Sequence, residues 1–257
     1  MDTNTVLQLN SVSKNFGGLQ AVCDVQMRVT HGQRHGLIGT NGAGKTTLFN
    51  LIAGDLPVST GTIVLFGTDV TTMPVHKRTR LGLRRTYQTP ALFNGLTVRE
   101  NLYLALLGND PPMRHLSCWK SAFKDTEKLN LVQSTAETVE LSRRLDDKVG
   151  DLSHGERKQL EIGMVLSTNP RLLLLDEPAA GLSVHEREVM KDLLRSIASD
   201  ITLFIIEHDM DMVIHLADRI TVMYDGVVLA EGDPKQIQAD PDVQRVYLGE
   251  AINGTGA

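Results

Sequence analysis

The sequence predicts an α/β fold in which helices cover both faces of a parallel sheet. Short aliphatic runs at residues 172–175, 202–206 and 220–224 alternate with stretches of helical spacing, a pattern typical of parallel strands buried on both faces. A glycine-rich loop joins an expected strand at residues 35–38 to an expected helix at residues 47–53. With 257 residues, 41% of them hydrophobic and 22% charged, the chain is long enough for one large folded domain.

The first third of the chain predicts a second sheet, made of antiparallel strands. Residues 6–9 and 25–29 alternate apolar and polar side chains, or nearly so, and residues 61–65 form a β-branched run bounded by glycines. Such segments are typical of strands with one buried face. We therefore expect an antiparallel β subdomain in addition to the parallel sheet.

A helical subdomain is expected at about residues 92–151, where glycines become rare. Residues 98–107 and 122–141 have helical spacing, and Pro111 and Pro112 separate them. We expect this segment to be an insertion into the α/β core.

The whole chain, residues 1–257, is expected to form a single domain. Its core takes residues 1–91 and 152–240, and residues 241–257 form a C-terminal helix and tail. Three more helices and a last strand are expected within the second part of the core, at residues 153–167, 184–198, 209–216 and 227–230.

Composition and charge exclude several classes of protein. The formal net charge is −5, whereas a nucleic-acid-binding domain usually carries an excess of Lys and Arg, so we expect no nucleic-acid partner. Cys23 and Cys118 have neither the spacing of a metal site nor the number that a disulfide scaffold needs. The first five residues lack the pattern of a signal peptide, and the longest aliphatic run, residues 172–175, is far shorter than the ~20 apolar residues that cross a bilayer. We expect a soluble chain that reaches a membrane only through a partner.

A phosphate-binding loop is predicted between the strand at residues 35–38 and the helix after it. The segment matches G-x-x-x-x-G-K-[ST] with the required strand before it and helix after it, which favours this interpretation over a glycine-rich turn with a surface lysine. Backbone N–H groups would bind phosphate oxygens, Lys45 would reach the β- and γ-phosphates, and Thr46 would offer a hydroxyl to Mg²⁺. The expected nucleotide-binding residues are Gly39, Thr40, Asn41, Gly42, Ala43, Gly44, Lys45, Thr46 and Thr47.

Two acids at the end of a buried strand predict hydrolysis of the nucleotide. Residues 172–175 are followed by Asp176, Glu177 and Pro178, and the carboxyl ends of parallel strands face the ligand in such sheets. Asp176 would hold hydrated Mg²⁺, and Glu177 would polarise the attacking water. Taken alone, these residues also fit a turn that closes a strand, but beside a phosphate loop we favour the catalytic interpretation.

A third motif, residues 152–156 (LSHGE), begins a helical stretch. Ser153 and Glu156 have the spacing of a capping box, with Ser153 as the N-cap residue. The capping box does not account for Gly155, which allows the backbone to come close to an anion at the start of a helix.

The order of these motifs, together with Ile206-Glu207-His208-Asp209, resembles the ATP-binding subunits of ABC transporters over nearly the whole chain. The resemblance implies a P-loop NTPase core of the ABC ATPase type, which hydrolyses ATP with Mg²⁺. The signature of that family is commonly LSGGQ, and here His154 and Glu156 replace its third and fifth residues.

The resemblance also assigns roles to individual residues. Ser153 and Gly155 would contact the γ-phosphate of a nucleotide held by the opposite subunit. Gln88 would sense Mg²⁺ and the attacking water, His208 would contact the γ-phosphate, and Phe16 would stack on adenine. The alternatives are a plain loop residue for Gln88, a strand-end residue that caps the next helix for His208, and a core residue for Phe16. The expected catalytic residues are Glu177, His208, Lys45 and Gln88, and the expected Mg²⁺ contacts are Thr46, Gln88 and Asp176.

Three local matches resemble the branch that imports branched-chain amino acids, amides and urea, namely residues 85–88 (RTYQ), 207–211 (EHDMD) and 241–250 (PDVQRVYLGE). They imply an energy-coupling subunit of an importer, peripheral to the cytoplasmic face of the inner membrane. Lipopolysaccharide-export ATPases share the Tyr-Leu-Gly-Glu ending and are the alternative within the family. ABC ATPases without a transport role are a more distant alternative.

The resemblance implies several partners. These are a second ATPase subunit, either a related chain or a second copy, two membrane permease subunits and, indirectly, a solute-binding protein. Residues 90–93 (PALF) would form part of a groove for a permease helix, with a simple hydrophobic turn as the alternative. Ser183 stands where many relatives carry an aspartate in a loop between subunits.

Overall fold

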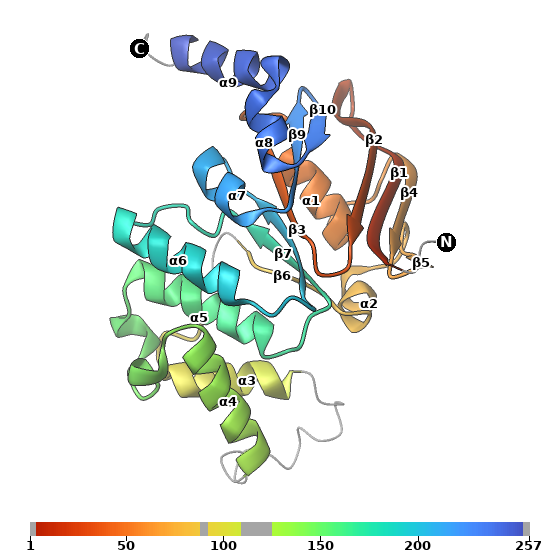
Figure 1. Cartoon of the computed structure of the whole chain (residues 1–257). Helices are drawn as coiled ribbons and strands as arrows, with labels where there is room; N and C mark the ends of the chain where they lie inside the picture. The colour runs from red at the N-terminus through yellow and green to blue at the C-terminus, as the bar shows by residue number, and fades with distance from the viewer. Residues whose placement is uncertain (1–3, 88–91, 109–124, 254–257) are drawn as a thin grey trace. The chain divides into compact units, whose positions relative to one another are not determined.

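The computed structural model describes residues 4–87, 92–108 and 125–253. These residues group into two compact units (Figure 1). The first unit comprises Met1–Arg85, Arg171–Glu177 and Ala198–Ala257, and the second comprises Thr86–Pro170 and Pro178–Ile197. The domain boundaries expected near residues 92 and 151 stay a prediction, because they divide the chain by sequence pattern rather than by contacts.

The first unit contains the expected parallel sheet. Five of its six strands run parallel to their neighbours, and the strand at one edge is antiparallel. Each parallel neighbour is separated in sequence by at least one helix, as expected when helices provide the crossovers. The order across the sheet is β10 (Val227–Gly232), β9 (Arg219–Tyr224), β3 (Arg34–Gly39), β8 (Thr202–Ile206), β7 (Leu172–Asp176) and β6 (Leu83–Arg85).

The second sheet of this unit is antiparallel, which confirms that prediction. The sequence pattern made its first two strands too short, because β1 (Thr5–Phe16) and β2 (Leu19–Thr30) each run for 12 residues and form a hairpin. Register shifts interrupt the alternation of buried and exposed positions along β1, so the pattern does not extend over the whole strand. The sheet has the order β2, β1, β4 (Thr60–Leu65) and β5 (Thr68–Asp69).

The described residues of the first unit include five helices. The helices predicted after the glycine-rich loop, near residue 209 and at the C-terminus are confirmed, whereas two short helices were not predicted. One of these two, α8, has Pro at its start and a capping box formed by Asp233 and Gln236. The five are α1 (Lys45–Ala53), α2 (Val75–Arg80), α7 (Met210–Leu216), α8 (Pro234–Ala239) and α9 (Pro241–Asn253).

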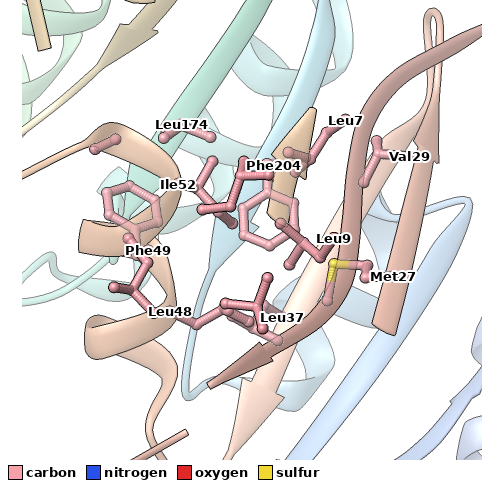
Figure 2. Packing of buried hydrophobic residues seen from close by; sticks show 14 of the residues in the cluster. Leu7, Leu9, Met27, Val29, Leu37, Leu48, Phe49, Ile52, Leu174 and Phe204 are labelled. Carbon is pink, nitrogen blue, oxygen red and sulfur yellow. The ribbon is translucent and has the colours of Figure 1, made fainter. Parts of the chain in front are cut away.

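One hydrophobic cluster joins the two sheets of the first unit through α1 (Figure 2). The side chain of Phe204, from β8, lies among residues of β1, β3 and α1, and it is fully buried. Because α1 contributes one side of this cluster, packing fixes the helix that follows the glycine-rich loop against the sheet. Residues shown in the cluster include Leu7, Leu9, Leu37, Leu48, Phe49, Ile52 and Leu174.

The second unit is helical. Helix α3 (Val98–Leu107) packs on α4 (Thr126–Thr138) and α5 (His154–Leu166), and α5 packs on α6 (Val184–Ser196). Short 3₁₀ helices occupy Ser142–Arg144 and Val149–Asp151. The predicted helix at residues 98–107 agrees with α3, and α4 lies within the predicted range 122–141.

Within the described parts of the chain, no helix has the length and hydrophobicity needed to cross a membrane.

Candidate nucleotide-binding site

The loop between β3 and α1 has the conformation that a phosphate-binding loop needs. Gly44, directly before α1, has φ 95°, and a Cβ at this position would lie 2.3 Å from the backbone oxygen of Ala21. A Cβ on Gly39 would lie 2.2 Å from the backbone oxygen of Met223. Only glycine fits at these two positions, since backbone atoms of the unit surround them. The N-cap residue of α1 is Gly44, which has no side chain to cap the helix, and an uncapped helix start favours an anion.

The expected lysine lies inside this loop. Lys45 is 7% exposed, and its Nζ donates hydrogen bonds to the backbone oxygens of Gly39 (2.7 Å) and Thr40 (2.9 Å). The ammonium group is therefore held across the loop at the place where the motif binds phosphate. Of the other predicted loop residues, Thr40 and Ala43 are buried, Gly44 and Thr47 are half-buried, and Asn41, Gly42 and Thr46 are exposed.

Strand pairing brings the predicted acid Asp176 to the same edge of the sheet. Leu37 of β3 pairs with Ile206 of β8, and Ile206 pairs in turn with Asp176, the last residue of β7. Asp176 is 7% exposed. The carboxyl ends of three parallel strands thus meet at the edge where the phosphate loop begins, as predicted for a nucleotide site.

Glu177 follows Asp176 in a backbone conformation that is rare for a residue with a side chain. Its φ is 48°, and its N–H donates a hydrogen bond to the backbone oxygen of Ile206 (3.0 Å). Residues other than glycine adopt this left-handed conformation at a cost of about 1–2 kcal/mol, and such strain gathers at functional sites. The turn directs the chain away from β7 immediately after the two acids.

His208 lies near Glu177, as the predicted catalytic pair requires. Its Nδ1 is 3.7 Å from Glu177 Oε1 and 3.9 Å from Glu207 Oε2. Both distances are longer than a hydrogen bond. The side chains of His208 and Glu177 are 59% and 33% exposed, respectively. Asp209 fixes the following turn, because its side chain accepts a hydrogen bond from the Met212 N–H at the start of α7.

Phe16 ends β1 with its ring in contact with solvent. The residue is 45% exposed, so the alternative of a buried core phenylalanine is wrong. Lys14 Nζ lies 5.1 Å from the ring centroid, a cation–π contact. An exposed ring of this kind is suited to stacking on a planar base.

In the second unit, the capping box predicted at the start of α5 is confirmed. Ser153 Oγ accepts a hydrogen bond from the Glu156 N–H, and the Glu156 side chain accepts one from the Ser153 N–H. Ser153 Oγ and the Gly155 N–H also donate to one oxygen of Glu186, at 3.2 and 3.1 Å. Glu186 was not predicted as a site residue.

Gln88 lies outside the described residues, as do Pro90 and Ala91. The neighbouring Tyr87 is half exposed, and its N–H donates a hydrogen bond to Glu161 Oε1 (3.0 Å). Phe93, the last residue of the predicted docking segment, is 55% exposed.

Comparison with known proteins agrees with this geometry. Residues 22–180 match the family model described as ABC transporter, and residues 227–252 match the model described as branched-chain amino acid ATP-binding cassette transporter. The chain belongs to the ABC transporter ATP-binding family. It is therefore an ATP-binding cassette, and members of this family hydrolyse ATP.

The cassette resembles its relatives over almost its whole length. It is 38% identical to the high-affinity branched-chain amino acid transport ATP-binding protein BraF of Pseudomonas aeruginosa, covering 96% of this chain and 98% of the relative. It is 36% identical to the corresponding protein LivG of Escherichia coli, with the same coverage. A solved ATP-binding cassette of an ABC transporter in its ADP conformation is 33% identical, covers 95% of this chain and 99% of its own, and has a TM-score of 0.83.

Arg85 of the cassette was not predicted as a site residue, although it contacts two parts of the site. Its Nη2 lies 3.9 Å from Asp176 Oδ2, and its Nη1 donates to Asn50 Oδ1 (3.0 Å) and contacts Asp55. The guanidinium also lies 4.8 Å from the centroid of the Phe49 ring. Arg85 thus connects the acid at the end of β7 to α1. Its position directly before the Thr-Tyr-Gln segment is the feature of the sequence that could have identified it as a site residue.

Arg78 closes the other end of α1. It is 2% exposed, and its Nη1 donates to the backbone oxygens of Leu51 and Ile52, both at 2.8 Å. Its Nε donates to the Met73 oxygen (2.8 Å), and burial lowers the pKa of the guanidinium without removing its charge at neutral pH. Helix C-terminal carbonyls favour a cation. No local pattern predicts this contact, because Arg78 lies among basic residues that resemble a solvated surface.

Glu207 is a second buried acid at this edge of the sheet. The residue is fully buried directly after β8, and its N–H donates to the Leu37 oxygen (3.3 Å). Like Asp176, it is an acid directly after a run of buried aliphatic residues. That shared pattern could have identified Glu207 as a site residue from the sequence.

Proposed function

We propose that this cassette is the energy-coupling subunit of an importer for branched-chain amino acids or related hydrophobic amino acids and amides. The observation that carries the proposal is the match of residues 227–252 to the branched-chain amino acid model, in a chain whose phosphate loop and Asp176 lie at one sheet edge. That C-terminal segment covers β10, α8 and most of α9. The named relatives from P. aeruginosa and E. coli also support the importer over a lipopolysaccharide exporter.

The residues of the phosphate loop fit a nucleoside triphosphate. Backbone N–H groups at the start of α1 would hold phosphate oxygens, with the positive end of the helix dipole adding to their attraction. Lys45 would leave the two carbonyl groups that it now contacts and donate to the β- and γ-phosphates. Phe16 would stack on the base, since its ring is exposed.

The donor set at the sheet edge also fits Mg²⁺. Thr46 supplies a hydroxyl and Asp176 a carboxylate, with Gln88 as the third expected contact. In the described part of the chain, no group of three or more acidic, His or Cys side chains has the arrangement to hold a metal ion by itself, so phosphate oxygens and water would complete the coordination of Mg²⁺. When bound, Mg²⁺ would neutralise charge on the transferred phosphoryl group.

Hydrolysis would depend on the pair at the ends of β7 and β8. Glu177 would accept a hydrogen bond from the attacking water and orient it, and His208 would donate to the γ-phosphate. Glu177 has φ 48°, and its Oε1 lies 3.7 Å from His208 Nδ1. Lys45 would stabilise the charge that develops on the phosphoryl oxygens.

The complete site would be shared with a second ATPase subunit, whose signature residues face this phosphate loop while Ser153 and Gly155 face the partner's nucleotide. The assembly would include two membrane permeases and a solute-binding protein, with the cassette at the cytoplasmic face of the inner membrane. The exposed Phe93 would contact a permease helix.

Reconstitution tests this proposal. The complex would be purified through a tag on this chain and placed in liposomes with its solute-binding protein, and uptake of leucine would be followed with and without ATP. We expect uptake that requires ATP and is lost in Glu177→Gln, while Glu188→Gln, on the exposed face of α6, transports normally. Recovery of an exporter's membrane subunits instead of importer permeases would refute the proposal.

A further inference from the structure

One carboxylate in the second unit accepts four hydrogen bonds from two different helix starts. Glu186 belongs to the first turn of α6, where its Oε2 accepts from the N–H and the hydroxyl of Ser183, at 3.0 and 2.8 Å. Its Oε1 reaches α5 and accepts from Ser153 Oγ (3.2 Å) and the Gly155 N–H (3.1 Å). The start of each helix is an electropositive position, and hydrogen-bond donors from both starts bind this one carboxylate.

Gly155 is necessary for this approach. A Cβ at Gly155 would lie 2.7 Å from Glu186 Oε1. The glycine that the capping box left unexplained therefore leaves room for an anion, and in this structure that anion is Glu186. Its hydrogen bonds, above all those from Ser183 and then from Gly155, lower the pKa of Glu186 to about 2. The side chain is charged at neutral pH.

We propose that Glu186 is a positioning residue that holds the signature donors, Ser153 and Gly155, until the γ-phosphate of the partner's nucleotide replaces it. The inference rests on the proposed function in one respect, namely that these two donors contact that phosphate. It adds that the signature turn is never an open anion site: an internal carboxylate occupies it before the two subunits close on ATP.

Hydrogen-bond stoichiometry supports the exchange. The hydroxyl of Ser153 has a single proton, which it cannot give to Glu186 and to a phosphate oxygen at the same time. Two anions on the same two donors would also repel each other. ATP-driven closure must therefore break the bonds from Ser153 and Gly155 to Glu186.

The exchange has a measurable consequence. A site whose competent state is only partly populated has a weaker apparent affinity for its ligand. Glu186 would thus raise the ATP concentration needed for closure without taking part in the chemical step. Hydrogen bonds to a charged acceptor are roughly twice as strong as bonds to a neutral one, so neutralising this carboxyl should ease its displacement.

The test compares Glu186→Gln with Glu188→Gln in the purified complex. The complex is purified through a tag on this chain, so the same procedure serves whether the cassette pairs with a second copy or with a related chain. Glu188 lies two residues away on α6, and its side chain is 61% exposed. ATP hydrolysis is measured as a function of ATP concentration. We expect Glu186→Gln to lower the half-saturating ATP concentration by about threefold or more, with a smaller change in the maximal rate, and Glu188→Gln to match the unmodified complex.

A purely structural role for Glu186 predicts a different result. The half-saturating ATP concentration would then stay unchanged or rise, and either outcome overturns the inference. If the unmodified complex itself neither binds ATP nor closes, the proposed function fails first, so the two failures are distinguishable.

A second measurement needs no substitution and decides the question if Glu186→Gln does not fold. In the complex with this chain isotope-labelled, the carboxyl ¹³C signal of Glu186 and the amide signal of Gly155 are followed while a nonhydrolysable ATP analogue is added. We expect both signals to move together as closure occurs. A Glu186 signal that stays constant through closure would contradict the exchange.

Discussion

The phosphate loop of the first unit and the signature turn (residues 153–156) of the second unit both end in a helix start, yet their donors have different partners. In the loop, backbone atoms of the surrounding strands fix the conformation, and the first N–H groups of α1 have no side-chain cap. In the signature turn, the donors are held by Glu186, a side chain that can move. The first region is therefore preformed for phosphate, and the second must exchange one anion for another.

The largest expected effect on ATP binding separates the two regions by their roles. Lys45→Ala removes the only charged side chain of the loop and should weaken ATP binding by this chain by about 30- to 100-fold. Ser153→Ala should leave that affinity unchanged, because its γ-phosphate belongs to the partner's site. Equilibrium binding of fluorescent ATP measures both, with the exposed Lys235→Ala as the control. Equal losses in the Lys45 and Ser153 variants would remove the distinction.

Arg78 tests whether the hydrogen bonds at the C-terminal end of α1 stabilise the unit that contains the phosphate loop. Arg78→Met removes the guanidinium donor from the buried carbonyl groups of Leu51 and Ile52 and from the part-buried carbonyl of Met73, which should lower the free energy of unfolding by about 2–3 kcal/mol. Chemical denaturation measures the change. The neighbouring exposed variant Lys77→Met should have little effect, and an equally small effect at Arg78 would contradict this account.

Two glycines sharpen the comparison further. Gly44→Ala forces a Cβ against the Ala21 carbonyl at positive φ. The variant should lower the free energy of unfolding by at least about 1–2 kcal/mol and should also weaken ATP binding. Gly155→Ala meets no backbone but only side-chain atoms of Glu186, from Cγ to Oε1, and a side chain can adopt another rotamer, so the thermal stability should change much less. Thermal unfolding with and without ATP measures both variants. A larger loss of stability in Gly155→Ala than in Gly44→Ala would reverse the argument.

The pH dependence of stability also distinguishes the units. His35 in β3 is fully buried and stacked on Phe204, and burial, followed by the nearby charge of Arg219, lowers its pKa to about 3. Below pH 6.5 the unfolded chain binds a proton that the folded chain refuses, so the free energy of unfolding falls by up to about 1.4 kcal/mol per pH unit between 6.5 and 3. Glu186 adds to this loss of stability only below about pH 4.5, because its pKa is lowered from 4.5 to about 2.

Denaturation of His35→Gln between pH 7 and 5 measures the first contribution. The variant should lose this part of the slope, while Glu186→Gln should retain it over the same range. An unchanged slope in His35→Gln would show that another group titrates.

Local patterns were sufficient to predict most of the first unit. The strand at Thr202–Ile206, the phosphate loop and the acids after β7 each follow from a short run of residues whose periodicity or spacing has one physical explanation. The full length of β1 was missed because register shifts break its alternation. Helix α2 is only six residues long, too short for helical periodicity to identify it.

Long-range contacts could not be predicted in this way. Glu186 lies 33 residues from Ser153 in the sequence, and Arg78 lies 27 residues from Leu51. A capping box can be recognised at residues 183–186, but nothing in that pattern indicates that the second carboxylate oxygen reaches another helix. Such contacts depend on how helices pack, and local propensity does not encode that.

The most direct test of the whole account is ATP hydrolysis by the purified complex containing Glu177→Gln. We predict that the variant binds ATP as tightly as the unmodified complex and hydrolyses it at least about 100-fold more slowly, because the group that orients the water has lost its charge. An unchanged steady-state rate would show that hydrolysis does not depend on Glu177.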